Sequence, residues 1–328
     1  MKDKPLVTIV IPIRNRVDYL SESLRSILNQ NYRNIEIILS DNGSHHNITK
    51  ELISLSELDD RIIFRRNDLS VSMSCHFNQC LKVAKGKYFI IISDDDKISE
   101  NFIEQFVLEF ETNKEISIGM ASTLITDNES TISDNSSWVF KERKLISGLD
   151  MLRSFVSLNE EFKMPTFISV FAKTSDLIKI SGFPDFEGGG YADTALAIML
   201  MTMGDVICID TTFFYYRVYP TSSGLSMSHR KLRKCGKQLV KYFEGKREQL
   251  TIVIDFKFDS LKEKLVSMTY DTYYFRLLNI YNYNFAKRNL VILSHSYGFI
   301  MYTIKNKKPL IRSIKKILNY SNFKLIKK

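Results

Sequence analysis

Residues 88–96 read Tyr-Phe-Ile-Ile-Ile-Ser-Asp-Asp-Asp, a short apolar run that ends in three consecutive carboxylates. The aromatic and β-branched side chains predict a buried β-strand over 88–92. Carboxylates at the carboxyl end of such a strand lie where open α/β sheets bind ligands. Adjacent like charges repel, so we expect a cation or a hydrogen-bond network to offset them. Carboxylate oxygens suit a hard divalent cation. The alternative is a solvated acidic turn that caps a helix beginning near Ser99.

The sequence before this run alternates strand and helix patterns. Buried strands are predicted at 6–13, 35–39 and 61–65, and helices at 17–30, 47–58 and 74–84. Such alternation is typical of a parallel sheet with crossover helices, an α/β doubly wound architecture. The polar turns after Leu39 and after Ile92 should therefore face the same crevice, because both follow the carboxyl ends of strands.

The sequence after the aspartates is less regular. Strands are predicted at 115–125, 167–172, 206–209 and 213–218, and helices after a cap at 147–150 and over 191–203. Gly188-Gly-Gly190 predicts a flexible hinge before the second of these helices. Helical periodicity dominates from residue 226 onward. We therefore expect a site-bearing domain over 1–225 and a basic helical region over 226–328.

The composition is that of a well-packed globular protein. The 328 residues are 44% hydrophobic and 25% charged, which argues against disorder. The four cysteines are too scattered for a disulfide framework and lack the CxxC spacing of zinc sites, so we expect reduced thiols and a cytoplasmic location. The amino terminus shows no export signal, and no apolar stretch reaches the roughly 18 residues of a membrane-spanning helix.

Positive charge is concentrated at the carboxyl terminus. The formal net charge is +9, yet residues 272–328 contain twelve Lys or Arg and no Asp or Glu, which leaves the first 271 residues at −3. Such a block predicts an anionic partner, either a lipid surface or a nucleic acid. Apolar residues within 310–318 share one helical face, so this segment is either an interfacial membrane anchor or a helix packed on the domain. The Tyr-rich stretch 270–283 could pack a second copy of the chain or the domain itself.

Two common phosphate-binding loops are absent from the sequence. The first strand is followed by Pro12-Ile-Arg-Asn-Arg16, without the glycines of a dinucleotide-binding G-x-G-x-x-G loop. No G-x-x-x-x-G-K-[ST] motif of a kinase or ATPase occurs, and Gly188-Gly-Gly190 does not follow a strand. We therefore expect phosphate to be bound with a metal rather than in a glycine-rich loop.

Three motifs occur in order over the first 96 residues. They are Val7-Thr-Ile-Val-Ile-Pro-Ile-Arg-Asn-Arg16, Glu36-Ile-Ile-Leu-Ser-Asp-Asn-Gly-Ser44, and Asn78 followed by Ala84-Lys-Gly-Lys-Tyr88 and Asp94-Asp-Asp96. Together they resemble family 2 glycosyltransferases, whose patterns are close to V-S-V-I-I-P-x-Y-N-R, E-I-I-x-x-D-D-G-S and N…A-x-G-x-Y…D-x-D. The resemblance implies a GT-A fold, a Rossmann-like and mostly parallel central sheet with flanking helices, here with a C-terminal helical extension. It also implies a nucleotide-sugar donor and a divalent cation, Mn²⁺ or Mg²⁺.

The resemblance implies roles for single residues as well. It implies that Asp41 contacts the nucleotide base and Asp94 the ribose side, while Asp95 binds the metal and Asp96 either shares it or orders a coordinated water. The implied nucleotide-sugar site comprises Pro12, Arg14, Asn15, Asp41, Asn42, Asn78, Asp94 and Arg217. The alternative for Asp41 is a turn residue that bonds its own backbone.

The implied reaction needs a base to take the proton of an acceptor hydroxyl. Ser181-Gly-Phe-Pro-Asp185 resembles the family's G-G-F-D-like loop, and Tyr191-Ala-Asp193 resembles its acidic pair at a helix start. Asp193 is therefore the predicted catalytic base, with Ala192 in place of the usual first acid. The alternative for Asp193 is a charge that complements the helix dipole.

Residues 215–223 resemble the family's Y-R-x-H-x-x-S-x-S segment. This makes Arg217 a predicted diphosphate contact, with Tyr219 where a histidine is common. His76 and the other histidines outside this segment are expected to be surface or hydrogen-bonded residues rather than ligands.

We therefore expect a metal-dependent, inverting glycosyltransferase of the hexosyl or N-acetylhexosaminyl class. Its donor is a nucleotide-diphosphate sugar, with UDP favoured, and its acceptor is a lipid-linked glycan in bacterial surface polysaccharide biosynthesis. The basic tail would hold the enzyme at the inner face of the plasma membrane. We expect no nucleic-acid partner and leave a homo-oligomer open.

Two other functions were compatible with parts of the sequence. A sugar-phosphate nucleotidyltransferase also uses an α/β domain with a carboxylate-bound metal, but it would want a glycine-rich loop after the first strand. A nucleic-acid-binding protein would use the basic tail, but it leaves Asp41, the aspartate triplet and Asp193 unexplained.

Overall fold

The computed structural model describes residues 4–127, 129–132, 139–156, 170–187, 189–218, 227–254 and 257–266. The first elements along the chain are β1 (Val7–Ile13), α1 (Leu20–Leu28), β2 (Ile35–Asp41), α2 (His46–Ser56), β3 (Ile62–Arg66), α3 (Met73–Val83), β4 (Tyr88–Ile91), β5 (Lys97–Ile98) and α4 (Phe102–Thr112). The later ones are β6 (Ile116–Thr126), β7 (Lys144–Ile146), α5 (Gly148–Val156), β8 (Val170–Lys173), α6 (Thr174–Lys179), α7 (Ala192–Met201), β9 (Asp205–Arg217), α9 (His229–Gly245) and α10 (Arg247–Val253).

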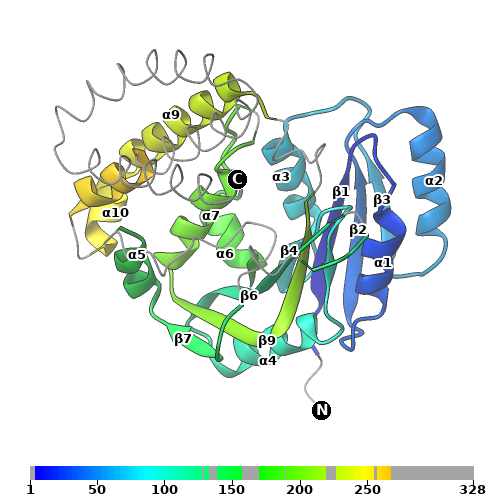
Figure 1. Ribbon diagram of the computed structural model, residues 1–328, viewed down its shortest axis with the longest axis horizontal. Helices are drawn as coiled ribbons and strands as arrows, with labels where there is room; N and C mark the ends of the chain where they lie inside the picture. The colour runs from blue at the N-terminus through cyan, green and yellow to red at the C-terminus, as the bar shows by residue number, and fades with distance from the viewer. Residues whose placement is uncertain are drawn as a thin grey trace, which may run out of the picture.

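These strands form one sheet in the order β3-β2-β1-β4-β8-β6-β9-β5, and β7 pairs with β9 (Figure 1). The half from β3 to β4 is parallel, as the alternation of strands and helices predicts. β8 is antiparallel to both of its neighbours, whereas β6 and β9 are parallel to each other. The predicted α/β class is confirmed, and the antiparallel strand joins the parallel half to the β6–β9 pair.

Apolar side chains fill both faces of the sheet. Alternate residues of β1 point to opposite sides, with Ile9 and Ile11 on one face and Val10 on the other. One face packs against α1, α2 and α4, and the other against α3, α5, α6, α7, α9 and α10. α7 is buried on nearly all sides, which explains why its sequence is apolar all round.

Most predicted elements are observed with small shifts at their ends, but one prediction was wrong. The strands predicted at 206–209 and 213–218 are a single strand, β9. Its register against β6 passes directly from Ile209 to Phe213, so the polar residues between them form a bulge that resembles a break in the sequence. The short elements β5, β7 and α6 were not predicted, because periodicity has no meaning over so few residues.

The C-terminal region is helical as far as it is described. α9 buries Leu232, Cys235, Leu239 and Phe243 in the same apolar cluster as α7. The predicted domain boundary at 225, the segment 270–283 and the whole of 272–328, with its segment 310–318, lie outside the described residues. Among the residues that are described, no helix has both the length and the apolar character needed to cross a membrane.

Candidate active site

Three loops meet at one edge of the sheet. β2, β1 and β4 are adjacent and parallel, so the loops that follow them emerge at the same edge. The Asn15 N–H donates to Ser44 Oγ at 2.8 Å, which joins the first loop to the second. Arg16 donates from Nε to Asp94 at 3.0 Å, which joins the first loop to the third. The structure therefore brings together the motifs that the sequence places at three strand ends.

The three aspartates are buried after β4. Asp94, Asp95 and Asp96 are 6%, 8% and 0% exposed, so the alternative of a solvated acidic turn is wrong. Arg16 binds two of them: its Nε and one terminal nitrogen donate to Asp94, and that terminal nitrogen lies 2.9 Å from Asp95 Oδ2. Arg16 is the last residue of the first motif, and the sequence predicted no role for it.

Burial raises the pKa of each carboxyl group in the triplet. Desolvation is the main cause of the raised pKa of Asp94, and Arg16 works against it. Desolvation and then the charge of Asp94 raise the pKa of Asp95 to about 6. Desolvation and then Asp95 raise the pKa of Asp96 well above its ordinary value. One guanidinium cannot neutralise three adjacent carboxylates, so this environment favours a further cation.

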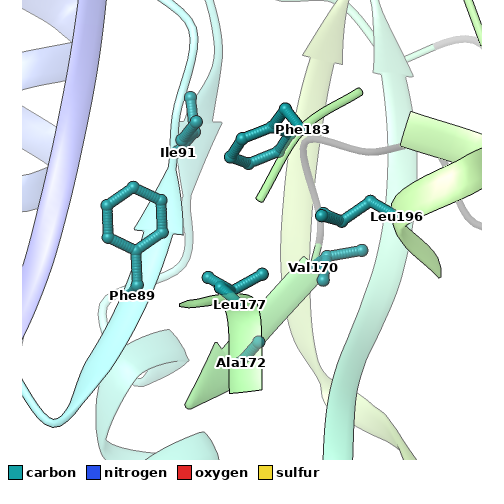
Figure 2. Close-up of a pocket in the computed structure, with 7 residues that line it drawn as sticks. All are labelled: Phe89, Ile91, Val170, Ala172, Leu177, Phe183 and Leu196. Atoms are coloured by element: carbon teal, nitrogen blue, oxygen red, sulfur yellow. The ribbon is translucent and has the colours of Figure 1, made fainter. Parts of the chain in front are cut away.

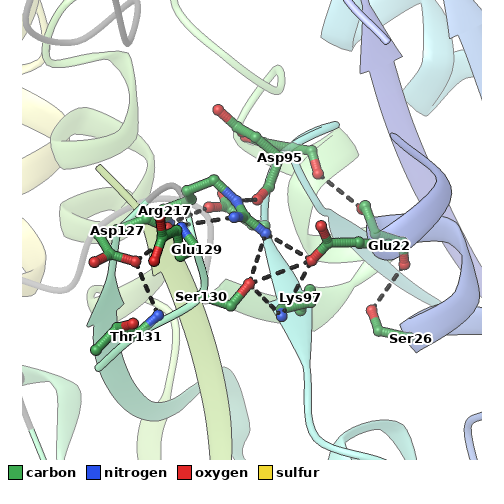
Figure 3. Close-up of polar contacts among 12 residues, drawn as sticks. Glu22, Ser26, Asp95, Lys97, Asp127, Glu129, Ser130, Thr131 and Arg217 are labelled. Atoms are coloured by element: carbon green, nitrogen blue, oxygen red, sulfur yellow. Dashed lines mark hydrogen bonds and ion pairs between the residues drawn. The ribbon is translucent and has the colours of Figure 1, made fainter. Parts of the chain in front are cut away.

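Arg217, at the end of β9, is buried and contacts the triplet; Figure 3 shows it beside Asp95 and Glu22. Its backbone N–H donates to Asp96 Oδ1 at 2.9 Å, and its Nε donates to the Asp95 carbonyl at 3.0 Å. Its guanidinium also pairs with Glu22 at 2.9 Å and lies 4.1 Å from the centre of the Tyr19 ring. The side chain has no exposed surface, so its observed role is to orient the triplet. The predicted diphosphate contact would require Arg217 to leave these partners.

One carboxylate oxygen of the triplet has no protein partner. Asp96 Oδ2 is buried and accepts no hydrogen bond within the described structure, which costs free energy unless something binds it. Carboxylate oxygens are suitable ligands for Mg²⁺ or Mn²⁺. Across the described residues, no three His, Cys, Asp or Glu side chains are arranged as a metal site, and Arg16 occupies Asp94 and Asp95. The carboxylate oxygens are chemically suited to a divalent cation, but in this structure those of Asp94 and Asp95 bind Arg16.

Asp41 ends β2 and is wholly buried. Its Oδ1 accepts the Ser44 N–H at 2.8 Å, and its Oδ2 accepts from Thr49 at 3.0 Å and from Arg66 at 2.8 Å. Desolvation acts to raise the pKa of Asp41, but these hydrogen bonds outweigh it and lower the pKa. The Asp41 carboxylate thus accepts a hydrogen bond from the backbone of its own turn, as the alternative interpretation predicts. A contact with a nucleotide base would be made besides these hydrogen bonds.

Asn15 and Asn42 fix the neighbouring loops. Asn15 has a left-handed backbone with φ 55°, and its Oδ1 accepts a backbone N–H of the loop after β2 at 2.9 Å. Asn42 accepts the Val71 N–H and donates to the Val71 carbonyl, each at 3.0 Å. Pro12 is half-buried within β1, and Arg14 is exposed just beyond it. These four predicted site residues therefore lie around the carboxyl ends of β1 and β2.

Asn78 links α3 to the loop that precedes the predicted base. Its Nδ2 donates to the Phe183 carbonyl at 2.9 Å, and its Oδ1 accepts the Phe183 N–H at 2.8 Å. The adjacent Gly182 has φ +66°, and a Cβ there would lie 2.2 Å from Asn78 Oδ1. The structure gives Asn78 a role in positioning this loop, and its contact with a donor stays a prediction.

Asp193 lies half-buried in the first turn of α7. Its Oδ1 accepts the N–H of the following residue at 2.7 Å. Tyr191, just before the helix, has φ 66°, which turns the chain sharply into α7. The preceding loop is held by α9, because the Glu187 N–H donates to Gln238 at 2.9 Å and the Glu187 carboxylate pairs with Lys234. α9 therefore fixes the loop that precedes the predicted base Asp193.

Part of the motif pattern lies at the opposite edge of the sheet and is structural. Glu36 accepts the Lys85 N–H at 2.6 Å, and the Gly86 N–H donates to Thr8 Oγ1 at 2.9 Å. A Cβ on Gly86 would lie 2.4 Å from the Thr8 nitrogen. These residues join β1, β2 and β4 at their amino ends, far along the strands from the aspartates.

Two pockets differ in character. An apolar cavity of about 10 Å³, too small for a sugar, lies between the sheet and the helices α6 and α7 (Figure 2), lined by Phe89, Ile91, Val170, Ala172, Leu177, Phe183 and Leu196. A pocket of about 270 Å³ lies between β2, β3 and α3, lined by Ser40, Arg65, Asn67, Gln79, Cys80, Lys82 and Val83. Neither pocket is lined by Asp41, the triplet or Asp193.

Comparison with known proteins relates the first half of the chain to one family. Residues 8–169 match the family model described as glycosyl transferase family 2. An uncharacterized glycosyltransferase of Haemophilus influenzae is 33% identical over 130 residues, which cover 39% of this chain and 40% of that protein. Glycosyltransferase GlyG of Streptococcus pneumoniae is 37% identical over 99 residues, or 30% of this chain and 33% of that protein. A protein of Escherichia coli named as a colanic acid biosynthesis glycosyl transferase, WcaA, is 31% identical over 109 residues, or 33% of this chain and 38% of that protein.

The fold is also similar to a solved structure. S. aureus TarS 1-349, crystallised in complex with UDP-GlcNAc, aligns with a TM-score of 0.59 and 13% identity over 83% of this chain and 72% of that chain. The predicted GT-A class is thereby confirmed at the level of the fold. The alignments span 33% to 40% of the length of the three sequence relatives above.

Proposed function

Residues 8–169 of this chain belong to glycosyl transferase family 2, and from this premise we propose that the protein is an inverting, metal-dependent glycosyltransferase. It moves a sugar from a nucleotide-diphosphate sugar, with UDP favoured, to a hydroxyl group of a glycan. The observation that carries the proposal is the buried triplet of Asp94, Asp95 and Asp96 at the edge of the sheet where Asp41 ends the neighbouring strand. All three motifs of the first 96 residues end at this edge, because β1, β2 and β4 are adjacent and parallel.

The donor would lie across the ends of β1, β2 and β4. Asp41 is held ionised by its hydrogen bonds, and a carboxylate can accept from the donor groups of a nucleobase. Asp94 would face the ribose. Pro12, Arg14, Asn15 and Asn42 would form the rim, with Asn78 and Arg217 fixing the loops behind it.

Asp95 and Asp96 are the residues that would hold a divalent cation, Mn²⁺ or Mg²⁺. When bound, such a cation stabilises the negative charge that develops on a diphosphate leaving group. Two observations support this assignment. Asp96 Oδ2 is buried without a hydrogen-bond donor, and desolvation and then the charge of Asp94 raise the pKa of Asp95 to about 6, so a bound cation would stabilise both carboxylates. Arg217 keeps both residues in place through its backbone N–H and its guanidinium.

Asp193 would act as the general base. Its carboxylate takes the proton of an acceptor hydroxyl as that oxygen bonds to the anomeric carbon of the sugar. The bond from the anomeric carbon to the diphosphate breaks on the opposite side, and the nucleotide diphosphate leaves with the electron pair, which inverts the configuration. The position of Asp193 at the start of α7, after a loop fixed by Asn78 and by α9, supports this role.

The acceptor proposed is a lipid-linked glycan of a bacterial surface polysaccharide. The likeness to WcaA, named for colanic acid biosynthesis, supports the polysaccharide class. The basic region 226–328 would place the enzyme at the inner face of the plasma membrane, since clusters of Lys and Arg are attracted to anionic lipids. Arg230, Arg233, Lys237 and Lys241 on α9 are exposed, which supports such a contact.

A thermal-shift screen of nucleotide-sugars tests the proposal. The melting temperature should rise with a UDP-sugar and rise further when Mn²⁺ is present, because a ligand of the folded state stabilises it by mass action. GDP-, dTDP- and CMP-sugars provide the comparison. If no donor shifts the melting temperature with or without Mn²⁺, the proposed function is wrong.

A further inference from the structure

Arg16 and the proposed divalent cation both need the carboxylate of Asp95. Arg16 donates to both oxygens of Asp94 and lies 2.9 Å from Asp95 Oδ2. Planar guanidinium groups bind carboxylates in this two-pronged manner, and the same oxygens are the preferred ligands of Mg²⁺ and Mn²⁺. A cation coordinated by Asp95 would lie next to the positively charged guanidinium of Arg16. The two cannot keep these contacts together without strong repulsion.

The two arginines around the triplet differ in how easily they can be displaced. The Arg217 side chain is 0% exposed and is fixed by Glu22 and the Asp95 carbonyl. The Arg16 side chain is 27% exposed, so it is partly in contact with solvent. Removing Arg16 from its partners exposes it to water, whereas moving Arg217 would leave a buried charge unpaired. Arg16 is therefore the arginine that can move.

We propose that Arg16 competes with the divalent cation for the aspartate triplet. Arg16 holds Asp94 and Asp95 when no cation is present, and it releases Asp95 when the cation binds. This inference rests on the proposed metal-dependent function. Arg16 satisfies buried carboxylates that would otherwise repel one another, and in doing so it lowers their affinity for the cation. The fold is thereby kept stable at the cost of weaker metal binding.

Direct measurement of Mn²⁺ binding tests the competition without any transfer reaction. Free Mn²⁺ is titrated by electron paramagnetic resonance against the full-length protein and against Arg16→Gln, in the absence of a donor. Loss of one competing unit charge in contact with the ligands should tighten binding on the order of tenfold. The matched control is Arg25→Gln, an exposed arginine on α1, which changes the net charge equally and should bind Mn²⁺ as the unaltered protein does.

Thermal melting provides the second readout. Arg16→Gln should melt at a lower temperature than the unaltered protein, and Mn²⁺ should restore more of its stability, because the cation then replaces the missing guanidinium. If Arg16→Gln does not fold, Arg16→Lys decides the question: it keeps the charge, loses the two-pronged geometry, and should bind Mn²⁺ more tightly than the unaltered protein by less than tenfold.

The outcomes separate this inference from the proposed function. Equal or weaker Mn²⁺ binding in both Arg16 variants, with measurable binding in the unaltered protein, overturns the competition and leaves the metal site in place. If no protein binds Mn²⁺ although UDP-sugars still raise the melting temperature, the metal assignment fails and the competition fails with it.

Discussion

Two arginines from distant parts of the chain contact the aspartate triplet. Arg16 approaches from the loop after β1 and Arg217 from the end of β9. Together they leave one buried oxygen of Asp96 without a partner. The triplet is thus held in place but not fully neutralised, which is the condition expected of a cation-binding site.

Two conservative variants should separate the base from the metal ligand. Asp193→Asn and Asp95→Asn should each reduce sugar transfer by about 10²- to 10⁴-fold. Only Asp95→Asn should also weaken the Mn²⁺-dependent stabilisation by a UDP-sugar, because the proposed base does not bind the donor. Transfer assays and thermal shifts check both statements, with Asp210→Asn in the β9 bulge as the control. Normal turnover by Asp193→Asn would remove this residue as the base.

His76 should make the stability of the protein depend on pH. It is buried beneath the β2 end, with a 2.7 Å hydrogen bond between its Nε2 and Ser40 Oγ, as expected for a satisfied histidine. Desolvation lowers the pKa of His76 to about 4, against an opposing effect of Asp41. Between about pH 6.5, the ordinary pKa of histidine, and about pH 4, His76 is therefore protonated in the unfolded chain but stays neutral in the folded protein.

Stability should accordingly fall as the pH falls from about 6.5 to about 4, by up to about 3 kcal/mol from this group. Urea unfolding at pH 7.5, 6 and 5 measures the slope. His76→Gln should flatten it, whereas His45→Gln, at an exposed histidine, should not. An unchanged slope in His76→Gln would show that other groups cause the pH dependence.

Tight packing between elements explains why several motif residues have little to do with chemistry. Gly86 allows β4 to approach β1, and Glu36 ties the loop before β4 to β2. Asn78 and Gly182 join α3 to the loop before α7. α9 then fixes the rest of that loop through Lys234 and Gln238. Strands and helices are thereby locked in the register that places the site residues.

A pair of glycine substitutions tests this packing. Gly86→Ala should reduce the free energy of unfolding by about 1–3 kcal/mol, because its Cβ would lie 2.4 Å from the Thr8 nitrogen. Gly245→Ala, where nothing lies within 4 Å of the added Cβ, should instead gain up to about 1 kcal/mol from helix propensity. Chemical denaturation of both variants measures the difference. Equal stabilities would mean that the strands can separate at Gly86 without cost.

Charge is distributed unequally over the whole chain. The excess of Lys and Arg falls in the C-terminal region, and α9 presents basic side chains on its exposed face while its apolar face is buried against the domain. α9 cannot insert its apolar face into a bilayer without leaving the core. A membrane contact through α9 would therefore be electrostatic.

Vesicle binding should reflect this distribution. The full-length protein should sediment with vesicles that contain anionic lipid and detach at high salt, because salt screens exposed charges. Changing Arg230, Arg233, Lys237 and Lys241 on α9 to Gln should cost about 1 kcal/mol of binding free energy per charge. The matched control changes Arg25, Lys50, Arg65 and Lys82, which are exposed elsewhere. Equal losses in both variants would mean that net charge, and not α9, drives binding.

The sequence by itself determined the positions of the strands in the first 96 residues and their parallel arrangement, the burial of β1 and β4 and the carboxyl-end position of the aspartates. These follow from local periodicity and from the rule that parallel strands end at one edge. Only the tertiary structure decided that Arg16 binds Asp94 and Asp95 and that Arg217 is buried beside them. It also decided that α9 holds the loop before Asp193. These contacts join residues far apart in the chain, and side-chain packing in three dimensions, rather than any periodic pattern, selects such partners.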